Sequence, residues 1–316
     1  MKIVFCGETF PGAPRSLKHY LAASGADEIV VSPNTSLAAA MDGAEVAIPL
    51  MCRIDAALMD GGRLRLIQQW GAGLDGVDLE AARARGIWVA NVPASGGNAD
   101  SVAEHSLLLI LALLRQLNLA QANVRAGVLG APLGTMLAGR TVTLWGLGAI
   151  AQALARRLRA FGVRLLGITR DSTAAKLRVL NLDAVYPFAE RRRALAQTDI
   201  LVVCLSLSAN TRGIVNQDAL AALPPGAWLV NPARGALVDY EALYAALASG
   251  KLGGAGLDVY WQEPIAPDDP LLAFPNVVAT PHIAGVTDGS YDKIATAVAD
   301  NLERLRRGEP PLNRAV

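Results

Sequence analysis

Three side chains in the second half of the sequence, Arg234, Glu263 and His282, have the chemical types that reduction of a 2-keto acid requires. Such a reduction needs a cation for the substrate carboxylate, a proton donor for the developing alkoxide and a group that holds this donor in place. The Arg234 guanidinium is a permanently charged fork that matches a carboxylate and can polarise the carbonyl beside it. His282 can donate a proton near neutral pH, and a neighbouring Glu263 would favour its protonated form and fix its orientation. These residue types indicate an oxidoreductase of 2-keto and 2-hydroxy acids, with the same histidine as the base in the reverse direction.

All three candidates lie in loops that contain Gly and Pro and follow apolar runs. The loops are NPARG (231–235), GLDVYWQEP (256–264) and TPHIAG (280–285). Parallel α/β sheets bind ligands at the carboxyl ends of their strands, so this shared setting favours a common site. A single Arg, Glu or His is more often structural, and we expect a structural role for His19 and His105, which lie in helical surroundings.

A glycine-rich segment upstream has the pattern of a dinucleotide-binding loop. Residues 141–145 run directly into Gly146-Leu147-Gly148-Ala149-Ile150-Ala151 and then into a helix-like stretch. In this pattern the first Gly makes the tight turn, the second lets the backbone approach a pyrophosphate, and the third small residue, here Ala151, allows close packing of helix on strand. The helix start supplies free N–H groups for phosphate. The motif alone is weak, but the strand before it and the helix after it favour NAD or NADP as the cofactor.

The residues after the next predicted strand (165–168) bear on the choice between these two cofactors. The fingerprint expects an acidic side chain there, about 20 positions on, to hold the ribose 2′-hydroxyl. The sequence has Thr169 and Arg170 instead, followed by Asp171. A hydroxyl beside a guanidinium could bind a 2′-phosphate, which favours NADP(H). Alternatively, Arg170 is a solvated surface residue and Asp171, or no acid, serves NAD(H).

Short apolar runs alternate with helical stretches along the chain, which is typical of parallel α/β sheets. The predicted strands are 2–5, 28–31, 45–48, 64–69 and 87–90 in the first part, and 141–145, 165–168, 200–205, 227–231, 255–259 and 277–280 in the second. The chain has 316 residues, and one domain typically has roughly 100–200. We therefore expect an α/β protein with two Rossmann-like or flavodoxin-like domains and a cleft between them.

Two predicted helices set the domain boundaries. Ser101 to Glu104 has capping-box spacing before an apolar run, so a long helix is expected to begin near Ser101 and to bridge the domains. From about Gly289 a second helix is expected, and we place it back on the first domain. Its apolar residues recur at helical spacing, at Ile294, Val298, Leu302 and Leu305. The substrate domain is thus predicted to be discontinuous, at 1–98 plus 287–316, and the dinucleotide-binding domain to span 99–286.

Composition argues against several other classes of protein. Lys and Arg (29) nearly balance Asp and Glu (28), so no global field attracts a nucleic acid. The most apolar stretch, 107–114, is far shorter than the roughly 20 residues that span a bilayer, and the N-terminus lacks the long apolar region of a signal peptide. Cys6, Cys52 and Cys204 have no paired spacing, and no Cys/His cluster suggests a metal. We expect a cytoplasmic protein without membrane or nucleic-acid partners.

The combined motifs GLGAIA, NPARGALVD, GLDVYWQEP and TPHIAG resemble the D-isomer-specific 2-hydroxyacid dehydrogenase family, and the similarity runs from about Gln69 to Gly285. This family includes phosphoglycerate dehydrogenases and glyoxylate/hydroxypyruvate reductases. The resemblance implies Arg234 as substrate-binding, His282 as acid/base and Glu263 as its partner. It also implies that backbone N–H groups of the turn Gly71-Ala72-Gly73 bind the substrate carboxylate. Asp258 is placed near the nicotinamide carboxamide, and the full set of candidate cofactor-binding residues is Gly146, Gly148, Ala149, Ile150, Thr169, Arg170, Pro232, Ala233, Asp258 and Gly285.

Two alternatives stay open beside an enzyme that reduces glyoxylate or hydroxypyruvate. A non-enzymatic NAD(H)-sensing module of the corepressor type shares the architecture and similar loops, but this chain lacks long interaction tails. Formate dehydrogenase shares the fold, but its reaction needs no carbonyl protonation, so the predicted His282/Glu263 pair points away from it. The stretch 93–102 is longer than the family's usual pattern, which could alter substrate size preference. A homodimer through the helix near Ser101 and the segment after it is implied by the resemblance.

Overall fold

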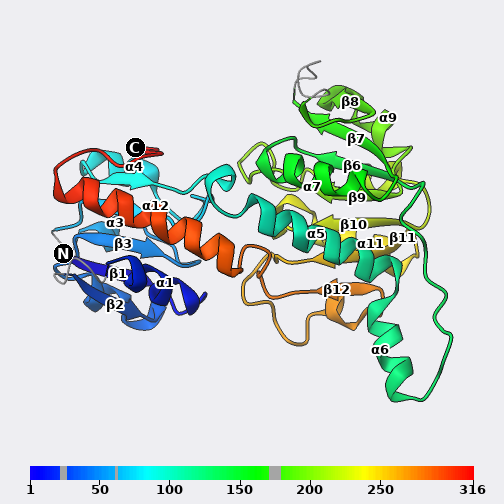
Figure 1. Ribbon diagram of the computed structural model, residues 1–316, viewed down its shortest axis with the longest axis horizontal. Helices are drawn as coiled ribbons and strands as arrows, with labels where there is room; N and C mark the ends of the chain where they lie inside the picture. Colours follow the sequence, from blue (N-terminus) through cyan, green and yellow to red (C-terminus); the bar gives the residue numbers. More distant parts are fainter. Residues whose placement is uncertain (22–26, 61–62, 171–178) are drawn as a thin grey trace. The chain divides into compact units, whose positions relative to one another are not determined.

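The computed structural model describes residues 1–21, 27–60, 63–170 and 179–316. The described chain divides into two compact units (Figure 1). Unit 1 comprises Met1–Asn98 and Gly285–Val316, and unit 2 comprises Ala99–Ala284. Each unit has its own parallel sheet covered by helices, which confirms the predicted α/β class.

Unit 1 is built on a five-stranded sheet in the order β2-β1-β3-β4-β5, with every pairing parallel. The strands are β1 (Lys2–Cys6), β2 (Glu28–Ser32), β3 (Val46–Pro49), β4 (Leu66–Gln68) and β5 (Trp88–Ala90). The five predicted runs are therefore confirmed. The chain's end closes the β5 edge of the sheet, because the Ala315 N–H donates to the Val89 carbonyl over 2.7 Å.

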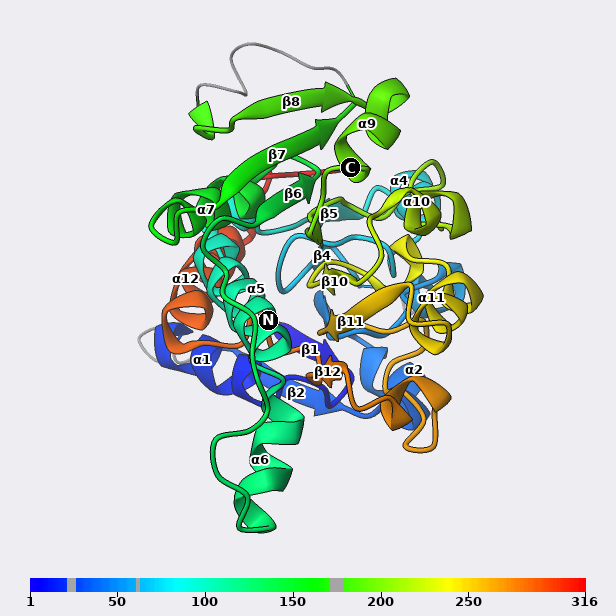
Figure 2. The same ribbon diagram turned by 90° about the vertical axis from the view of Figure 1, so that its right-hand side faces the viewer.

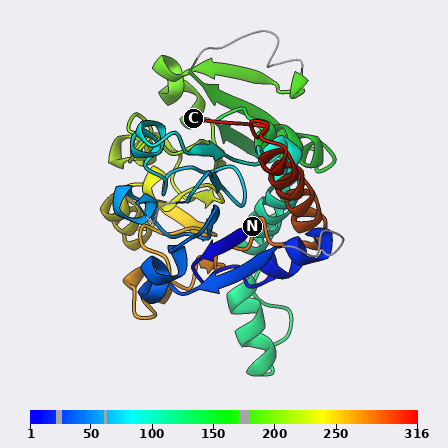
Figure 3. The ribbon, with the colours of Figure 1, turned by 90° about the vertical axis from the view of Figure 1, so that its left-hand side faces the viewer.

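Helices cover both faces of this sheet because successive strand residues point to opposite faces. Ile3 and Phe5 of β1 pack toward α1 and α12, whereas Val4 and Cys6 pack toward α2, α3 and α4. Figure 3 shows α1 and α12 side by side. The helices are α1 (Gly12–Leu21), α2 (Leu37–Met41), α3 (Ala56–Met59), α4 (Leu79–Ala84) and α12 (Asp288–Arg306). The predicted tail helix is α12, and its four periodic apolar residues are buried in this core.

Unit 2 is built on a seven-stranded sheet in the order β12-β11-β10-β9-β6-β7-β8 (Figure 2). The strands are β6 (Thr141–Trp145), β7 (Arg164–Thr169), β8 (Ala184–Pro187), β9 (Ile200–Val203), β10 (Ala227–Asn231), β11 (Leu252–Leu257) and β12 (Val277–Ala279). The six predicted strands are confirmed and β8 was missed. It is a short, half-buried edge strand that ends in Pro187, and proline is tolerated at such an edge, so its sequence pattern is weak.

The described helices of unit 2 are α5 (Ala99–Leu114), α6 (Leu117–Arg125), α7 (Ala149–Arg159), α9 (Arg191–Leu195), α10 (Gln217–Ala222) and α11 (Tyr240–Ala248). Helices α5, α9 and α11 contact strands of the sheet, whereas α6 extends from the end of α5 away from the sheet (Figure 2). Helix α5 approaches β11 closely because glycine stands at the contact: a Cβ on Gly256 would lie 3.1 Å from the Leu109 Cβ. Short 3-10 turns complete the described chain, at Asn34–Ser36, Ala94–Gly96, Phe188–Glu190, Gly235–Leu237 and Pro270–Ala273.

The long helix predicted near Ser101 exists, but the predicted capping box is wrong. Helix α5 begins at Ala99, so Ser101 lies inside the first turn, and its hydroxyl donates to the Ala284 carbonyl over 2.6 Å. The tertiary partner replaces the local cap that the spacing suggested. In the described ranges no helix alone has the length and hydropathy to cross a bilayer. Helices α5 and α6 meet the length and composition test only as a pair, bent by 59°.

Candidate functional site

The strand register of unit 2 brings the predicted loops to one edge of the sheet. Asn231 at the end of β10 pairs with Leu257 at the end of β11, and Leu257 pairs with Ala279 at the end of β12. Because the strands are parallel, the loops carrying Arg234, Glu263 and His282 all leave this carboxyl edge. Strand β6 ends at the same edge, so the Gly-rich loop after Trp145 joins them.

The imidazole of His282 and the carboxylate of Glu263 form a hydrogen-bonded pair. His282 Nδ1 lies 2.7 Å from Glu263 Oε2, and both side chains are mostly buried, at 22% and 16% exposed. The other oxygen, Oε1, accepts the Tyr260 backbone N–H over 2.9 Å. An ionised carboxylate can only accept, so Nδ1 carries the hydrogen of this pair. Nε2 is then the ring nitrogen that can exchange a proton with a substrate, as the sequence predicts for an acid/base.

His282 has an unusual backbone conformation. Its φ is +55°, in the left-handed region that costs a residue with a side chain about 1–3 kcal/mol. The surrounding hydrogen bonds stabilise this conformation, since the His282 N–H lies 2.8 Å from the Asp258 carbonyl. The next two amides, those of Ile283 and Ala284, donate to the Asp258 carboxylate over 2.9 and 2.8 Å. The turn is therefore hydrogen-bonded both to the backbone carbonyl and to the side-chain carboxylate of Asp258.

Asp258 is a fully buried carboxylate with a complete set of donors. Burial opposes its ionisation, but hydrogen bonds from His105, from Thr280 and from the Ala284 and Ile283 amides outweigh burial and lower the pKa of Asp258. The Thr280 hydroxyl donates to Oδ1 over 2.7 Å, and His105 Nε2 lies 3.4 Å from the same oxygen. The structure thus places Asp258 under the His282 turn, and its predicted contact with a nicotinamide carboxamide stays a prediction.

Tyr260 braces both members of the acid/base pair. Its backbone holds Glu263, and its hydroxyl donates to the Thr280 carbonyl over 2.9 Å, two residues before His282. Burial, followed by the negative charges of Asp258 and Glu263, raises the pKa of Tyr260 to about 12. The phenol therefore keeps its proton at neutral pH and remains a donor. Sequence reasoning did not single out this residue.

Arg234 follows β10 in a loop that its neighbours shape tightly. The fully buried Asn231 side chain accepts from the Ala233 N–H over 3.1 Å and donates to the Arg234 carbonyl over 2.8 Å. Gly235 leaves no room for a side chain, because a Cβ there would lie 2.1 Å from the Tyr260 carbonyl carbon. Pro232 is buried, while Ala233 and Arg234 are partly exposed. The backbone on both sides of Arg234 is thus fixed.

The Gly-rich loop has the features that a dinucleotide requires. Gly146 has a φ of +98°, and a Cβ on it would lie 2.6 Å from the Cys204 carbonyl oxygen, so only glycine fits this turn. A Cβ on Gly148 would meet nothing within 4 Å, which leaves open space beside the backbone. The N-cap of α7 is Gly148, and among the described residues no side chain caps this helix start, which suits its first N–H groups to a phosphate. Ala151 is buried behind them. Ala149 and Ile150 are partly exposed on the first turn.

The structure describes two of the three residues that bear on cofactor type. Thr169 is the last residue of β7 and is 8% exposed, whereas Arg170 is exposed. Strand β7 pairs with β6 in register, Trp145 with Ile168, so Thr169 ends beside the Gly-rich loop. Asp171 lies outside the described residues. The last cofactor candidate, Gly285, belongs to unit 1, where a Cβ would lie 2.9 Å from Asn98 Nδ2.

In unit 1 the turn Gly71-Ala72-Gly73 is oriented through its carbonyl groups. Gly71 has a φ of +121°, and its carbonyl accepts from the Val92 N–H over 2.8 Å. The Ala72 carbonyl accepts from Asn91 Nδ2 over 2.7 Å. In a trans peptide the N–H points opposite to the C=O. The N–H groups of Ala72 and Gly73 therefore point away from these partners, as donors to an anion would.

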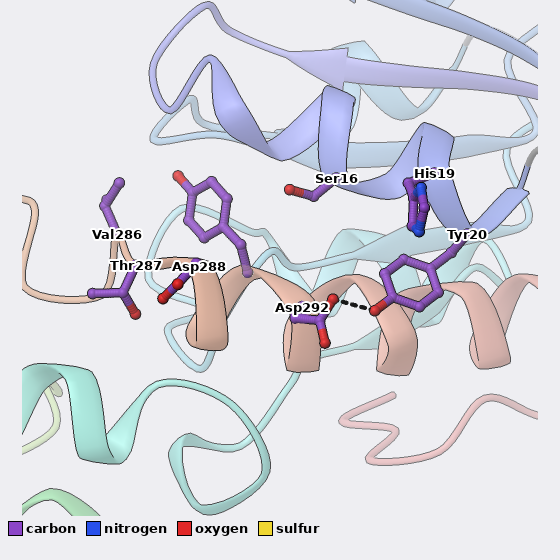
Figure 4. A pocket seen from close by; sticks show the side chains of 8 residues that line it. Ser16, His19, Tyr20, Val286, Thr287, Asp288 and Asp292 are labelled. Atoms are coloured by element: carbon purple, nitrogen blue, oxygen red, sulfur yellow. Dashed lines mark hydrogen bonds between the residues drawn. The ribbon is translucent and has the colours of Figure 1, made fainter.

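A separate hollow of about 430 Å³ lies in unit 1 between α1 and the start of α12 (Figure 4). It is lined by Ser16, His19, Tyr20, Val286, Thr287, Asp288, Tyr291 and Asp292. None of the predicted catalytic or cofactor residues is among them. The Tyr20 hydroxyl is hydrogen-bonded to Asp292 across the hollow. We therefore do not assign the chemistry to this hollow, although it includes His19.

His105 lies on helix α5, in the helical surroundings expected of it, and its side chain contacts the loop after β12. Its Nε2 lies 2.9 Å from the Thr280 hydroxyl, so it joins the cluster beneath His282. The signal in the sequence is its spacing from Ser101, which also contacts this loop: residues four apart share one helix face. Spacing alone could not show that this face meets the loop after β12.

The chain matches known proteins over most of its length. The profile described as "D-isomer specific 2-hydroxyacid dehydrogenase, NAD binding domain" matches residues 107–284. The chain is 36% identical over 270 residues to a glyoxylate reductase of Korarchaeum cryptofilum, a match that covers 82% of this chain and 79% of that protein. It is 37% identical over 276 residues to a D-3-phosphoglycerate dehydrogenase of Mycobacterium leprae, covering 86% of this chain but only 51% of that longer protein.

A solved structure with the same fold is that of an NADPH-dependent glyoxylate/hydroxypyruvate reductase from Sinorhizobium meliloti, in complex with NADP and malonate. The TM-score is 0.85 at 34% sequence identity, and the match covers 100% of this chain and 96% of that one.

Proposed function

The chain belongs to the D-isomer specific 2-hydroxyacid dehydrogenase family, and we propose that it reduces glyoxylate, hydroxypyruvate or a 2-keto acid of similar size. It is a nicotinamide-dependent oxidoreductase of the class that interconverts 2-keto and 2-hydroxy acids. The observation that carries the proposal is the 2.7 Å pair of His282 Nδ1 and Glu263 Oε2, on a loop at the same sheet edge as the Gly-rich loop.

The residues of the chain divide the work as follows. Arg234 binds the substrate carboxylate and polarises the carbonyl through its charged fork. His282 delivers a proton from Nε2 to the carbonyl oxygen, while Glu263 stabilises the charged ring through Nδ1. In the oxidation direction the same Nε2 accepts the hydroxyl proton. The backbone N–H groups of Ala72 and Gly73 are the proposed further donors to the carboxylate.

Bound at the Gly-rich loop, the nicotinamide cofactor supplies or accepts the hydride. Gly146, Gly148 and the first turn of α7 would hold its pyrophosphate, with Ala149 and Ile150 beside it. Pro232, Ala233, Asp258 and Gly285 are the remaining proposed contacts. NADP(H) is the proposed preference, because β7 ends in Thr169 and the exposed Arg170. The reductase from Sinorhizobium meliloti, whose structure contains NADP, is consistent with this choice.

A substrate panel tests the proposed function directly. Purified protein is assayed at 340 nm with glyoxylate, hydroxypyruvate, pyruvate and phosphohydroxypyruvate, each with NADH and with NADPH. We expect turnover of at least one short keto acid, with production of the D-isomer wherever the product is chiral. Cofactor binding without turnover of any acid would contradict the proposal and favour the NAD(H)-sensing alternative, which the comparisons do not favour.

Cofactor preference has its own test. In Thr169→Asp a carboxylate would repel a 2′-phosphate and could accept from a 2′-hydroxyl. We expect the ratio of kcat/KM for NADPH to that for NADH to fall by about 10-fold or more, the change that 1.4 kcal/mol produces. Arg170→Ala should lower the same ratio, and the exposed Arg192→Ala serves as control. A wild-type enzyme that strongly prefers NADH would refute the assignment.

We also propose a homodimer formed through α5, α6 and the segment after them. Large apolar side chains are exposed there: Leu129 is 91%, Leu133 92% and Val124 75% exposed. In unit 2 a hollow of about 330 Å³ at the base of α6 is lined partly by apolar residues such as Leu113 and Leu117. A two-fold dimer uses the same patch on both copies, so one copy's exposed leucines can fill the other's hollow. The double variant L129E/L133E should run as a monomer in light scattering; an unchanged mass would disprove this interface.

A further inference from the structure

We propose that His105 is a positioning residue for His282, holding the turn at 280–284 through Thr280 and Asp258. The inference rests on the proposed function, in which His282 moves the substrate proton. His105 acts through its two partners and not by touching the reacting atoms. Four features of the structure support it: the distances within the cluster, the burial of Asp258, the backbone conformation of His282 and the face of α5 that contacts the turn.

The distances determine which atom carries each proton of the cluster. Thr280 Oγ1 lies 2.7 Å from Asp258 Oδ1 and 2.9 Å from His105 Nε2. The hydroxyl has a single proton, and an ionised carboxylate only accepts, so this proton is donated to Asp258. His105 Nε2 must then carry the hydrogen that it shares with the hydroxyl, and it lies 3.4 Å from Oδ1 as well. His105 is therefore a donor into the cluster.

Asp258 links the cluster to the turn, because its carboxylate accepts hydrogen bonds from the cluster and from the turn. Asp258 accepts from the Ile283 and Ala284 amides, and it is fully buried, so water cannot replace a lost donor. Removing the His105 N–H frees the Thr280 hydroxyl to rotate and leaves Oδ1 with fewer donors. Fewer hydrogen bonds then stabilise the strained backbone conformation of His282, whose φ is +55°. A displacement of about 1 Å in a reacting group can lower a rate about 100-fold, so a small relaxation of this turn is enough.

Two residues on one face of helix α5 form hydrogen bonds with the turn. Ser101 donates to the Ala284 carbonyl over 2.6 Å, at the end of the turn. His105, four residues on, reaches the start of the turn at Thr280. Since residues four apart lie above one another on a helix, both contacts are made by the same face. The helix thus holds both ends of the His282 turn in a fixed position.

The test uses two substitutions of His105 and a matched control. His105→Leu removes the donor and keeps the bulk, while His105→Gln keeps an N–H near the position of Nε2. Thr198→Val is the control, because it removes another fully buried hydroxyl of unit 2, 2.6 Å from the Thr143 hydroxyl on β6. Each protein is studied by steady-state kinetics, by fluorescence titration of cofactor and by hydrogen exchange of peptides covering 280–286 without ligand.

We expect His105→Leu to lower kcat by about 10–100-fold at an unchanged KM for the keto acid, the pattern of a lost transition-state interaction. Its Kd for the cofactor should stay within about 3-fold of wild type, since a factor of 3 is under 1 kcal/mol. Exchange of the Ile283 and Ala284 amides should become at least about tenfold faster, in line with a more open turn. His105→Gln should restore most of both properties, and Thr198→Val should change neither, whatever its melting temperature.

Two results would overturn the inference: a His105→Leu enzyme with wild-type kcat and wild-type exchange at 280–286, or a His105→Gln enzyme as impaired as His105→Leu. If wild-type protein reduces no keto acid, the proposed function fails by itself. The exchange measurements, made without substrate, then decide whether His105 stabilises the turn at 280–284.

Discussion

The carboxyl edges of the two parallel sheets carry different kinds of chemical group. In unit 2 the loops after β10, β11 and β12 present side chains: a guanidinium, a carboxylate and an imidazole. In unit 1 the loop after β4 presents a glycine turn with backbone N–H groups, its carbonyls tied to Asn91 and Val92. One architecture therefore supplies titratable chemistry in one unit and fixed backbone donors in the other. The fold determines where ligands meet a sheet, and the loop residues determine what is done there.

The two units also differ in which parts of the chain their buried polar residues connect. In unit 1 Asn301 of α12 donates to Gln68 of β4 over 2.8 Å and accepts from the Leu312 N–H over 2.7 Å. This contact joins a helix, a strand and the C-terminal tail. In unit 2 the cluster of His105, Thr280 and Asp258 joins a helix to a loop. The first network should matter for stability and the second for turnover.

The largest expected effect is at His282. Replacing it by alanine should lower kcat by about 10²–10⁴-fold, the range for loss of a general acid, and leave cofactor binding nearly intact. His282→Gln should be similarly inactive, because an amide cannot exchange a proton near neutral pH. Steady-state kinetics with a cofactor titration measures both quantities. Unchanged turnover would remove His282 from the mechanism and erase the contrast between the two sheet edges.

A smaller effect is expected at Arg234. Lysine keeps the charge but loses the planar fork, so Arg234→Lys should lower kcat/KM for the keto acid by about 10–100-fold, as for loss of a hydrogen bond to a charged group. The control is Arg192→Lys, on the exposed ion pair with Asp218. If Arg234→Lys matched wild type, the carboxylate would have to be bound by other donors, for example those of unit 1.

In unit 1, Asn301→Ala should affect stability without affecting turnover. The change leaves the buried Gln68 Oε1 without the amide donor of Asn301 and removes the acceptor of the Leu312 N–H, at a cost of about 1–3 kcal/mol. Thermal melting and hydrogen exchange over β4 should show the loss, while kcat per folded molecule stays at the wild-type value. Thr296→Ala, on the exposed face of the same helix, should change neither. A drop in kcat for Asn301→Ala would show that the two networks are not separate in function.

The smallest effect concerns Asp258 in acid. Its folded-state pKa is lowered, so the ionised form stabilises the native protein at pH values above the ordinary pKa of Asp, about 3.9. That contribution is lost as the pH falls through the lowered folded pKa. Asp258→Asn should therefore melt below wild type at neutral pH, and the gap in Tm should narrow below about pH 4. A gap that stays constant with pH would mean that the charge of Asp258 does not stabilise the fold.

Much of this molecule can be predicted from local patterns. Alternation of apolar runs with turns located eleven of the twelve described strands, because buried parallel strands must be apolar. The Gly-rich loop and the periodic residues of α12 can be predicted equally well, since both patterns involve residues only a few positions apart. Strand β8 was missed because an edge strand is buried on fewer sides.

The chemical types of the site, namely Arg234, Glu263, His282 and the glycines before α7, can be predicted from the order of residues alone. The same local patterns predict that each of them follows a strand. Three contacts become visible only in the folded chain: Glu263 is hydrogen-bonded to His282, Asp258 accepts from the amides of the turn, and His105 on α5 contacts Thr280. These partners are separated by 19, 25 and 175 positions. Their contacts depend on strand register and helix packing, and no local propensity encodes either.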